Sequence, residues 1–213
     1  MLRTRLTTLI VIALLVVIVA CGGKSEKDRK NVLLPDAGSA HNRSQTEAAS
    51  ELQKVVDAYT KVKTFRATLE VEGPGFPKQR GNLEVVMPDK FHAKYPPVAG
   101  QPGTEVILIG SDTYFKTGDA WTKQAAPQGA TVLNASGVQS TVQSLVEAGA
   151  SKGPTDTVEG KKCQSYSASG QSGKQEICIA DNLPLRYSLE TGEIKTTLTF
   201  SDYNKDIEIK APV

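Results

Sequence analysis

The order of apolar and polar residues predicts an N-terminal helix followed by a strand. Between Ser44 and Lys63, apolar side chains recur every three to four residues, which is the spacing of one face of an amphipathic helix. Glu47 stands three residues after Ser44, as in a capping box. From Phe65 to Glu72 the apolar period changes to two, which is typical of a half-buried antiparallel strand. The pattern therefore predicts a helix over 44–63 and a strand directly after it.

Short alternating segments continue to the end of the chain, separated by turn-forming Gly, Pro, Asp and Ser. We expect strands at 82–87, 90–95, 104–109, 112–116, 121–124, 155–159, 162–169, 174–180, 185–190, 195–202 and 206–210. One segment between them differs, because Val138, Val142 and Leu145 recur at helical spacing and predict a second helix over 137–150. The expected fold class is α+β, with one large twisted antiparallel sheet and the helices on its concave side.

The N-terminus has the pattern of an export signal. Arg3 and Arg5 precede an apolar run over 9–20, which as a helix would rise only ~18 Å against a hydrocarbon core of about 30 Å. The run ends in Ile-Val-Ala-Cys, which resembles the lipobox of bacterial lipoproteins. We therefore expect a cleaved signal peptide over 1–20 and a lipid-modified Cys21. An ordinary signal peptide with a chance cysteine and an uncleaved anchor are the alternatives.

Lipidation of Cys21 would make membrane attachment effectively permanent, since several acyl chains on one residue add about 0.8 kcal/mol per buried methylene. Residues 21–43 are mainly charged and small, and we interpret them as the lipidated cysteine with a flexible tether that reaches about 25 Å. Residues 44–213 then form a single domain. Removing Arg3 and Arg5 lowers the basic count from 25 to 23, equal to the 23 acidic residues. Without a basic excess, nucleic acid is not an expected partner.

Two further cysteines, Cys163 and Cys178, lie in consecutive predicted strands. An even pair in an exported protein suggests a disulfide. A hairpin that places the two cysteines directly opposite each other would turn at Gly170-Gln171, with glycine in the first turn position. Two free buried thiols are the alternative.

The sequence lacks the residues of familiar catalytic and metal centres. Its histidines are His41, in the tether, and His92, whose strand alternation places it with Lys90 and Lys94 toward solvent. With only these two histidines, the sequence does not match the ligand spacing of any familiar zinc site. It also contains no nucleophile, Walker or dinucleotide-binding motif. The carboxylates are interpreted as a solvated outer face: Glu70, Glu72, Glu84, Asp89, Glu105 and Asp112. We expect no catalytic residue, no metal and no cofactor, with a surface hydrolase as the weakest alternative.

The strongest functional feature is a set of apolar residues that alternation places on one inner face of the sheet. They are Phe65, Leu69, Val71, Leu83, Val85, Met87, Phe91, Tyr95, Val106, Leu108, Phe115 and Trp121. Alternation by itself does not distinguish a filled core from a ligand cavity, and a filled core is the commoner outcome.

Several segments together resemble a known family. Beyond the lipobox, these are the helix end and first strand over 60–71, Gly81–Val86, Pro88–Phe91, the turn over 109–114, and the closing residues 201–212. The sequence is similar to the LolA-like superfamily, especially the LppX/LprG-type lipoproteins of mycobacteria. The resemblance implies an unclosed half-barrel, covered by helices, whose apolar cavity carries the acyl chains of lipids or lipoproteins across the envelope.

The resemblance suggests a lipid carrier at the outer leaflet or periplasmic face of the bacterial cell membrane. In that function the twelve apolar residues would line the cavity, the 138–146 helix would act as a movable lid, and an envelope transport protein could be a partner. We expect a monomer. The alternative is a lipid-anchored sensor or scaffold of the same fold that binds an envelope protein. A cavity of several hundred Å³ would favour the carrier, whereas a packed interior would favour the sensor.

Overall fold

The computed structural model describes residues 38–98, 102–126, 135–170 and 173–212, so the predicted signal peptide, Cys21 and most of the tether lie outside the described residues. Within these ranges it contains the helices α2 (Gly38–Tyr59) and α3 (Ala135–Glu147). The strands are β1 (Thr64–Gly73), β2 (Phe76–Val86), β3 (Lys90–Tyr95), β4 (Thr104–Ile109), β5 (Asp112–Thr117), β6 (Ala120–Ala125), β7 (Ser151–Val158), β8 (Lys161–Gly170), β9 (Gly173–Ala180), β10 (Leu183–Thr191) and β11 (Ile194–Ser201).

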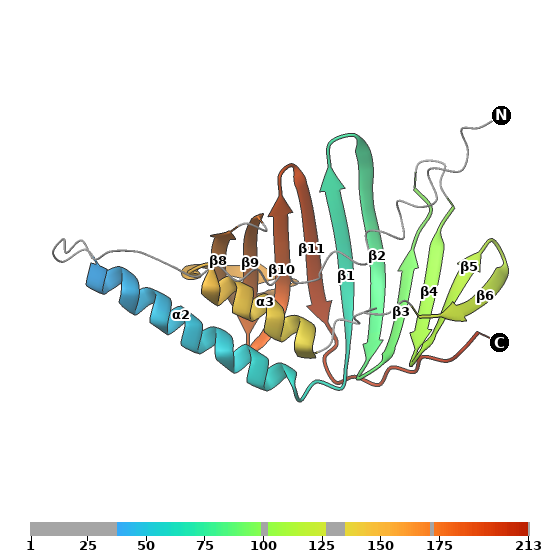
Figure 1. Ribbon diagram of the computed structural model, residues 1–213, viewed down its shortest axis with the longest axis horizontal. Helices are drawn as coiled ribbons and strands as arrows, with labels where there is room; N and C mark the ends of the chain where they lie inside the picture. Colours follow the sequence, from blue (N-terminus) through green and yellow to red (C-terminus); the bar gives the residue numbers. More distant parts are fainter. Residues whose placement is uncertain (1–37, 99–101, 127–134, 171–172, 213) are drawn as a thin grey trace.

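All of these strands form one antiparallel sheet in the order β6-β5-β4-β3-β2-β1-β11-β10-β9-β8-β7. Its two halves are consecutive meanders, joined where β1 pairs with β11. The end strands β6 and β7 do not pair with each other, so the sheet stays open. Figure 1 shows the sheet with both helices on the same side. The predicted α+β class and the unclosed half-barrel are confirmed.

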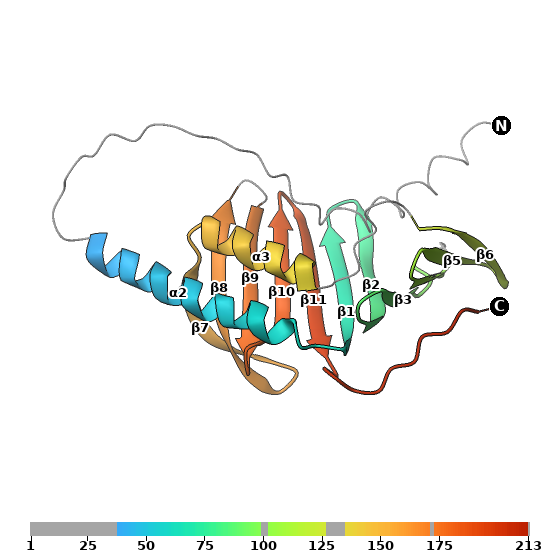
Figure 2. The ribbon, with the colours of Figure 1, turned by 60° about the horizontal axis from the view of Figure 1, so that its bottom comes forward.

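The two helices cover only one half of the sheet. They pack against each other, α2 contacts β7 and β10, and α3 contacts β8. Figures 1 and 2 show both helices lying across β8–β11, whereas β2 and the strands beyond it lie beside the helices. Among the described residues, therefore, no helix lies over the inner face of the half formed by β2–β6.

Helix α2 forms on the predicted apolar spacing. Ala48, Leu52, Val55 and Tyr59 lie along one side of the helix and are at most 1% exposed. The helix begins at Gly38, six residues before the capping signal at 44, so that the last residues assigned to the tether are helical. No proline or β-branched residue interrupts 38–43, and the helix can continue upstream. It ends at Tyr59, a few residues earlier than predicted.

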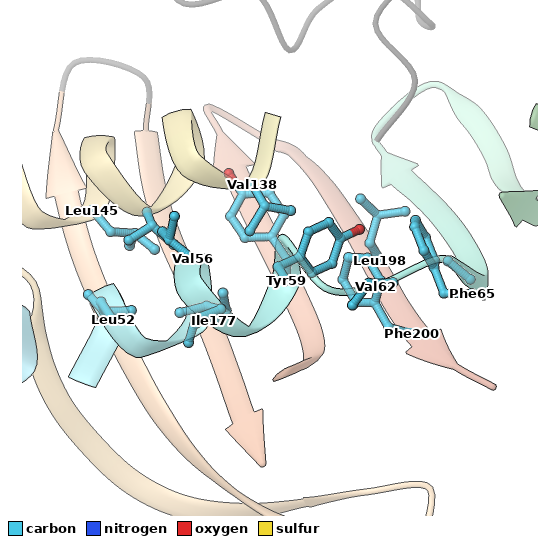
Figure 3. Close-up of a cluster of buried hydrophobic side chains, with 14 of the residues drawn as sticks. Leu52, Val56, Tyr59, Val62, Phe65, Val138, Leu145, Ile177, Leu198 and Phe200 are labelled. Carbon is cyan, nitrogen blue, oxygen red and sulfur yellow. The ribbon is translucent and has the colours of Figure 1, made fainter. Parts of the chain in front are cut away.

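The core under the helices is filled. Leu52, Leu145 and Ile177 are among its most buried side chains, and Figure 3 shows them between the two helices and the sheet. A short polar chain crosses this core: the amide nitrogen of Gln175 donates to Ser144 Oγ at 3.0 Å, and its oxygen accepts from Tyr187 Oη at 3.2 Å. These bonds satisfy a buried glutamine and tie α3 to β9 and β10.

The C-terminal segment differs from the prediction. Residues 206–210 were expected to form a strand, but they are not part of the sheet. Ile207 and Ile209 instead pack on the outer face against Ile107 and Tyr114, and all four side chains are less than 9% exposed. The segment runs below the sheet in Figure 1 toward β4 and β5. Alternation of Ile207 and Ile209 therefore reflects one-sided packing of an extended chain rather than strand pairing.

The predicted disulfide between Cys163 and Cys178 is confirmed, with a Cα–Cα distance of 5.5 Å. The predicted register is wrong by two residues. Cys178 pairs with Ser165, so the two cysteines are diagonal neighbours, and the hairpin closes with Gly170 opposite Gly173. Residue 171 of the predicted turn lies outside the described residues. Two directly opposed cysteines would have occupied a hydrogen-bonded pair of the ladder, which cross-strand disulfides use less often, and the diagonal arrangement avoids this.

Candidate functional site

The apolar inner face is built by the pairing of β1–β5. Phe65 lies opposite Val85, Val85 opposite Phe91, and Phe91 opposite Leu108. Directly paired residues project to the same face of a sheet, so the four side chains form one row across four strands. Eleven of the twelve residues named from the sequence lie on this side: Phe65, Leu69, Val71, Leu83, Val85, Met87, Phe91, Tyr95, Val106, Leu108 and Phe115.

Trp121 does not belong to the inner face. It pairs with Lys116, whose alternation with Phe115 points it outward, and it packs against the outer-face cluster that contains Ile207 and Ile209. The ammonium of Lys116 lies 5.8 Å from the centre of its ring. The sequence placed Trp121 with the inner residues because β6 is too short and too polar for its alternation to define a face.

One end of the inner face is occupied by the chain's own aromatic rings. Phe65 lies 5.9 Å from Tyr59, 5.8 Å from Phe200 and 5.9 Å from Tyr203, measured between ring centroids. Tyr59 comes from α2, so the rings join the helix layer to the strand pair β1 and β11. Phe65 is therefore a residue of the filled core under the helices (Figure 3).

The other end of the inner face lies beyond the helices. Leu83, Val106 and Leu108 are less than one tenth exposed, and Tyr95 and Phe115 are half-buried. The sequence analysis missed two small residues of the same rows, Ala67 and Ala93, which are 4% and 0% exposed and pair with Leu83 in register. Both alanines stand at alternate positions in the same strands, so the alternation would have included them if small residues had been counted.

Glycine deepens this part of the inner face. Gly81 pairs with β1 at Leu69, and a Cβ atom at Gly81 would come within 2.4 Å of the Tyr95 ring. The ring therefore lies directly over the glycine backbone, which a larger residue would prevent. The Tyr95 hydroxyl is neutral at physiological pH, and burial raises its pKa further, to about 12. The region offers aliphatic and aromatic surface without charge.

The outer face is polar, as predicted for its carboxylates. His92 lies between two of them: Nε2 is 2.8 Å from Glu105, and Nδ1 is 3.4 Å from Glu84. Partial burial raises the pKa of Glu105, but hydrogen bonds from His92 and Lys94 outweigh it, so this pKa lies below its ordinary value. His92 was expected in solvent; it does lie on the outer face, but its side chain is only 16% exposed.

The outer face contains two hollows. One, of about 330 Å³, is lined mainly by polar residues that include Arg66, Glu84 and His92. The other, of about 300 Å³, lies among the glutamates of the sheet and Arg186. Charged side chains line both hollows, which makes them poor sites for an acyl chain. Among the described residues, no three His, Cys, Asp or Glu side chains are grouped to hold a metal ion.

No protein-family model and no curated protein matches the sequence. Solved structures do match. The lipoprotein LppX of Mycobacterium tuberculosis is 13% identical, with a TM-score of 0.57, and the match covers 78% of this chain and 99% of LppX. LprF from Mycobacterium bovis is 15% identical, with a TM-score of 0.59, and the match covers 78% of this chain and 97% of LprF.

This chain has the LolA-like fold of LppX and LprF. The fold that the sequence resemblance implied is therefore confirmed. Within the part of the chain that the structure describes, no helix is both long enough and apolar enough to cross a bilayer.

Proposed function

We propose that this protein is a membrane-anchored lipoprotein that binds the acyl chains of a lipid against the inner face of β1–β5 and carries that lipid within the cell envelope. The observation that carries the proposal is the continuous apolar row from Leu83 to Phe115, on the half of the sheet beside the helices. Its side chains bear no charge, and the charged residues of the same strands point to the opposite face.

The inner face supplies the driving force for this function. Each methylene group that leaves water contributes about 0.8 kcal/mol, so a long acyl chain gains enough to offset the cost of immobilising it. Because side chains such as Leu52, Leu145 and Ile177 fill the core under α2 and α3, we propose that the acyl chain lies over β2–β5. Helix α3 buries Val142 and Leu145 at 3% and 0% exposure, so using this helix as a lid would require breaking part of the core.

The N-terminus supports a membrane location for this function. In the proposal, residues 1–20 direct export and are removed, and Cys21 carries the acyl chains of the anchor. The tether ends at 37, because α2 begins at Gly38. A carrier attached in this way stays near the membrane from which it takes its lipid, and the near-zero charge of the exported chain leaves the acyl chains as the main attachment.

Native mass spectrometry of the protein purified from a bacterial envelope tests the proposal. We expect a reproducible added mass from a non-covalent lipid. Phe115→Glu, which puts a charge on the inner face, should abolish it, because burying an unpaired carboxylate is costly. Thr199→Glu adds the same charge on the outer face and should leave the lipid in place. A bare mass, with no uptake of added lipid, would contradict the proposal.

A second function is favoured by one observation. The core under the helices is filled, and the two hollows described above lie on the outer face. A lipid-anchored scaffold or sensor would need no lipid cavity and would bind an envelope protein with its surface. A bare mass in the experiment above, together with wild-type stability of Phe115→Glu, would favour this function over the carrier.

A further inference from the structure

One buried polar atom on the inner face has no partner. The hydroxyl of Thr113 in β5 is inaccessible to solvent and makes no hydrogen bond, and the residue is 3% exposed. Buried hydroxyl groups are normally hydrogen-bonded, since leaving one unpaired costs free energy. A valine of the same shape would avoid that cost, so the hydroxyl does not serve the packing of the protein itself.

Thr113 stands at the border between the apolar and polar parts of the inner face. It pairs with Leu108 of β4 on one side and with Gln124 of β6 on the other. Leu108 continues the apolar row through Phe91 toward β1. Beyond Thr113, the exposed side chains of Thr122 and Gln124 make the edge of the same face polar.

Across these strands the side chains change from apolar to polar, as a lipid does from its acyl chain to its head group. We propose that the Thr113 hydroxyl donates a hydrogen bond to the ester or amide carbonyl that joins an acyl chain to its head group. The acyl chain then lies over β4, β3 and β2, and the head group leaves over β6 near Gln124. This inference rests on the proposed function and adds to it the chemical class of ligand, a carbonyl-linked lipid rather than an ether-linked one.

The chemistry of the linkage decides the selectivity. An ester carbonyl accepts a hydrogen bond in a buried site, and an ether oxygen is a much weaker acceptor at a different position. A site built around a buried polar group rejects ligands that leave it unpaired. We expect about tenfold tighter binding of an ester-linked lipid than of the ether-linked lipid with identical tails and head group.

The experiment is a competition between these two matched lipids. The full anchored protein, purified in detergent micelles, is given equal amounts of both, and native mass spectrometry measures the ratio of the two adducts. The wild-type ratio should be about ten to one. Thr113→Val should bring the ratio close to one without lowering the melting temperature, and Thr113→Ser, which keeps the hydroxyl, should retain the wild-type ratio.

Thr68→Val is the matched control, because Thr68 alternates with the inner-face Ala67 and Leu69 and points outward. It should leave the ratio unchanged. A wild-type ratio near one, or the same ratio in wild type and Thr113→Val, would overturn this inference while leaving lipid binding itself intact. Binding of neither lipid would overturn the inference and the proposed function together.

Discussion

Removing the disulfide between β8 and β9 should destabilise the domain strongly. Cys163 and Cys178 are 15 residues apart, and closing a loop of this length in the unfolded chain is worth about 3 kcal/mol. Both cysteines are buried, at 3% and 0% exposure, in a small outer-face cluster with Val158 and Leu185. The variant with both cysteines changed to alanine should therefore lose about 3 kcal/mol of unfolding free energy. For a domain of this size, its melting temperature should fall by about 6–12 °C.

Urea unfolding followed by circular dichroism measures this loss, with the midpoint and slope compared between variants. Wild-type protein unfolded in a reducing agent is the matched control, because it opens the loop without removing a side chain, and it should lose about as much unfolding free energy as the double variant. A loss below about 1 kcal/mol in the double variant would refute the reasoning. It would mean that the β8–β9 hairpin already holds the two cysteines close in the unfolded chain.

Two further predictions concern the C-terminal segment and a buried tyrosine. Replacing Ile207 and Ile209 with alanine should cost about 2 kcal/mol each in urea unfolding, since both are buried in the outer-face cluster, whereas Glu208→Ala between them should cost almost nothing. Burial raises the pKa of Tyr187 to about 12 in the folded protein, against 10.0 for an exposed tyrosine. Above pH 10 the unfolded chain loses this proton first, so Tyr187 by itself should lower the stability by about 1.4 kcal/mol per pH unit up to pH 12. Tyr187→Phe should reduce that slope in unfolding curves at pH 9, 10.5 and 11.5, and an unchanged slope would contradict the assignment.

The sequence determined the elements that follow a single periodicity. The apolar spacing of α2 and the strict alternation in β1 both appear in the structure at the predicted residues. Each pattern is compatible with only one orientation of its segment, because burying one side of a helix or strand determines which residues face the core. For the same reason, eleven of the twelve residues named for the inner face do lie there.

The C-terminal segment shows where local pattern misleads. Ile207 and Ile209 alternate as in a strand, but nothing in 206–210 shows whether a neighbouring strand is present. A signal did exist elsewhere: the run Val106–Ile109 is apolar at every position, which is typical of a strand buried on both faces. The run shows that the outer side of β4 needs a cover, but not that the C-terminal segment supplies it.

The functional details depend on tertiary structure. Strand order decided that β1 pairs with β11, and the packing of α2 and α3 over β7–β11 decided which half of the inner face the helices cover. The unpaired hydroxyl of Thr113 is likewise a property of its surroundings, since a threonine in an alternating strand looks ordinary in sequence. Periodicity reports how each segment divides between apolar and polar sides. Which segments meet depends on contacts between residues far apart in the chain, and no local pattern contains that information.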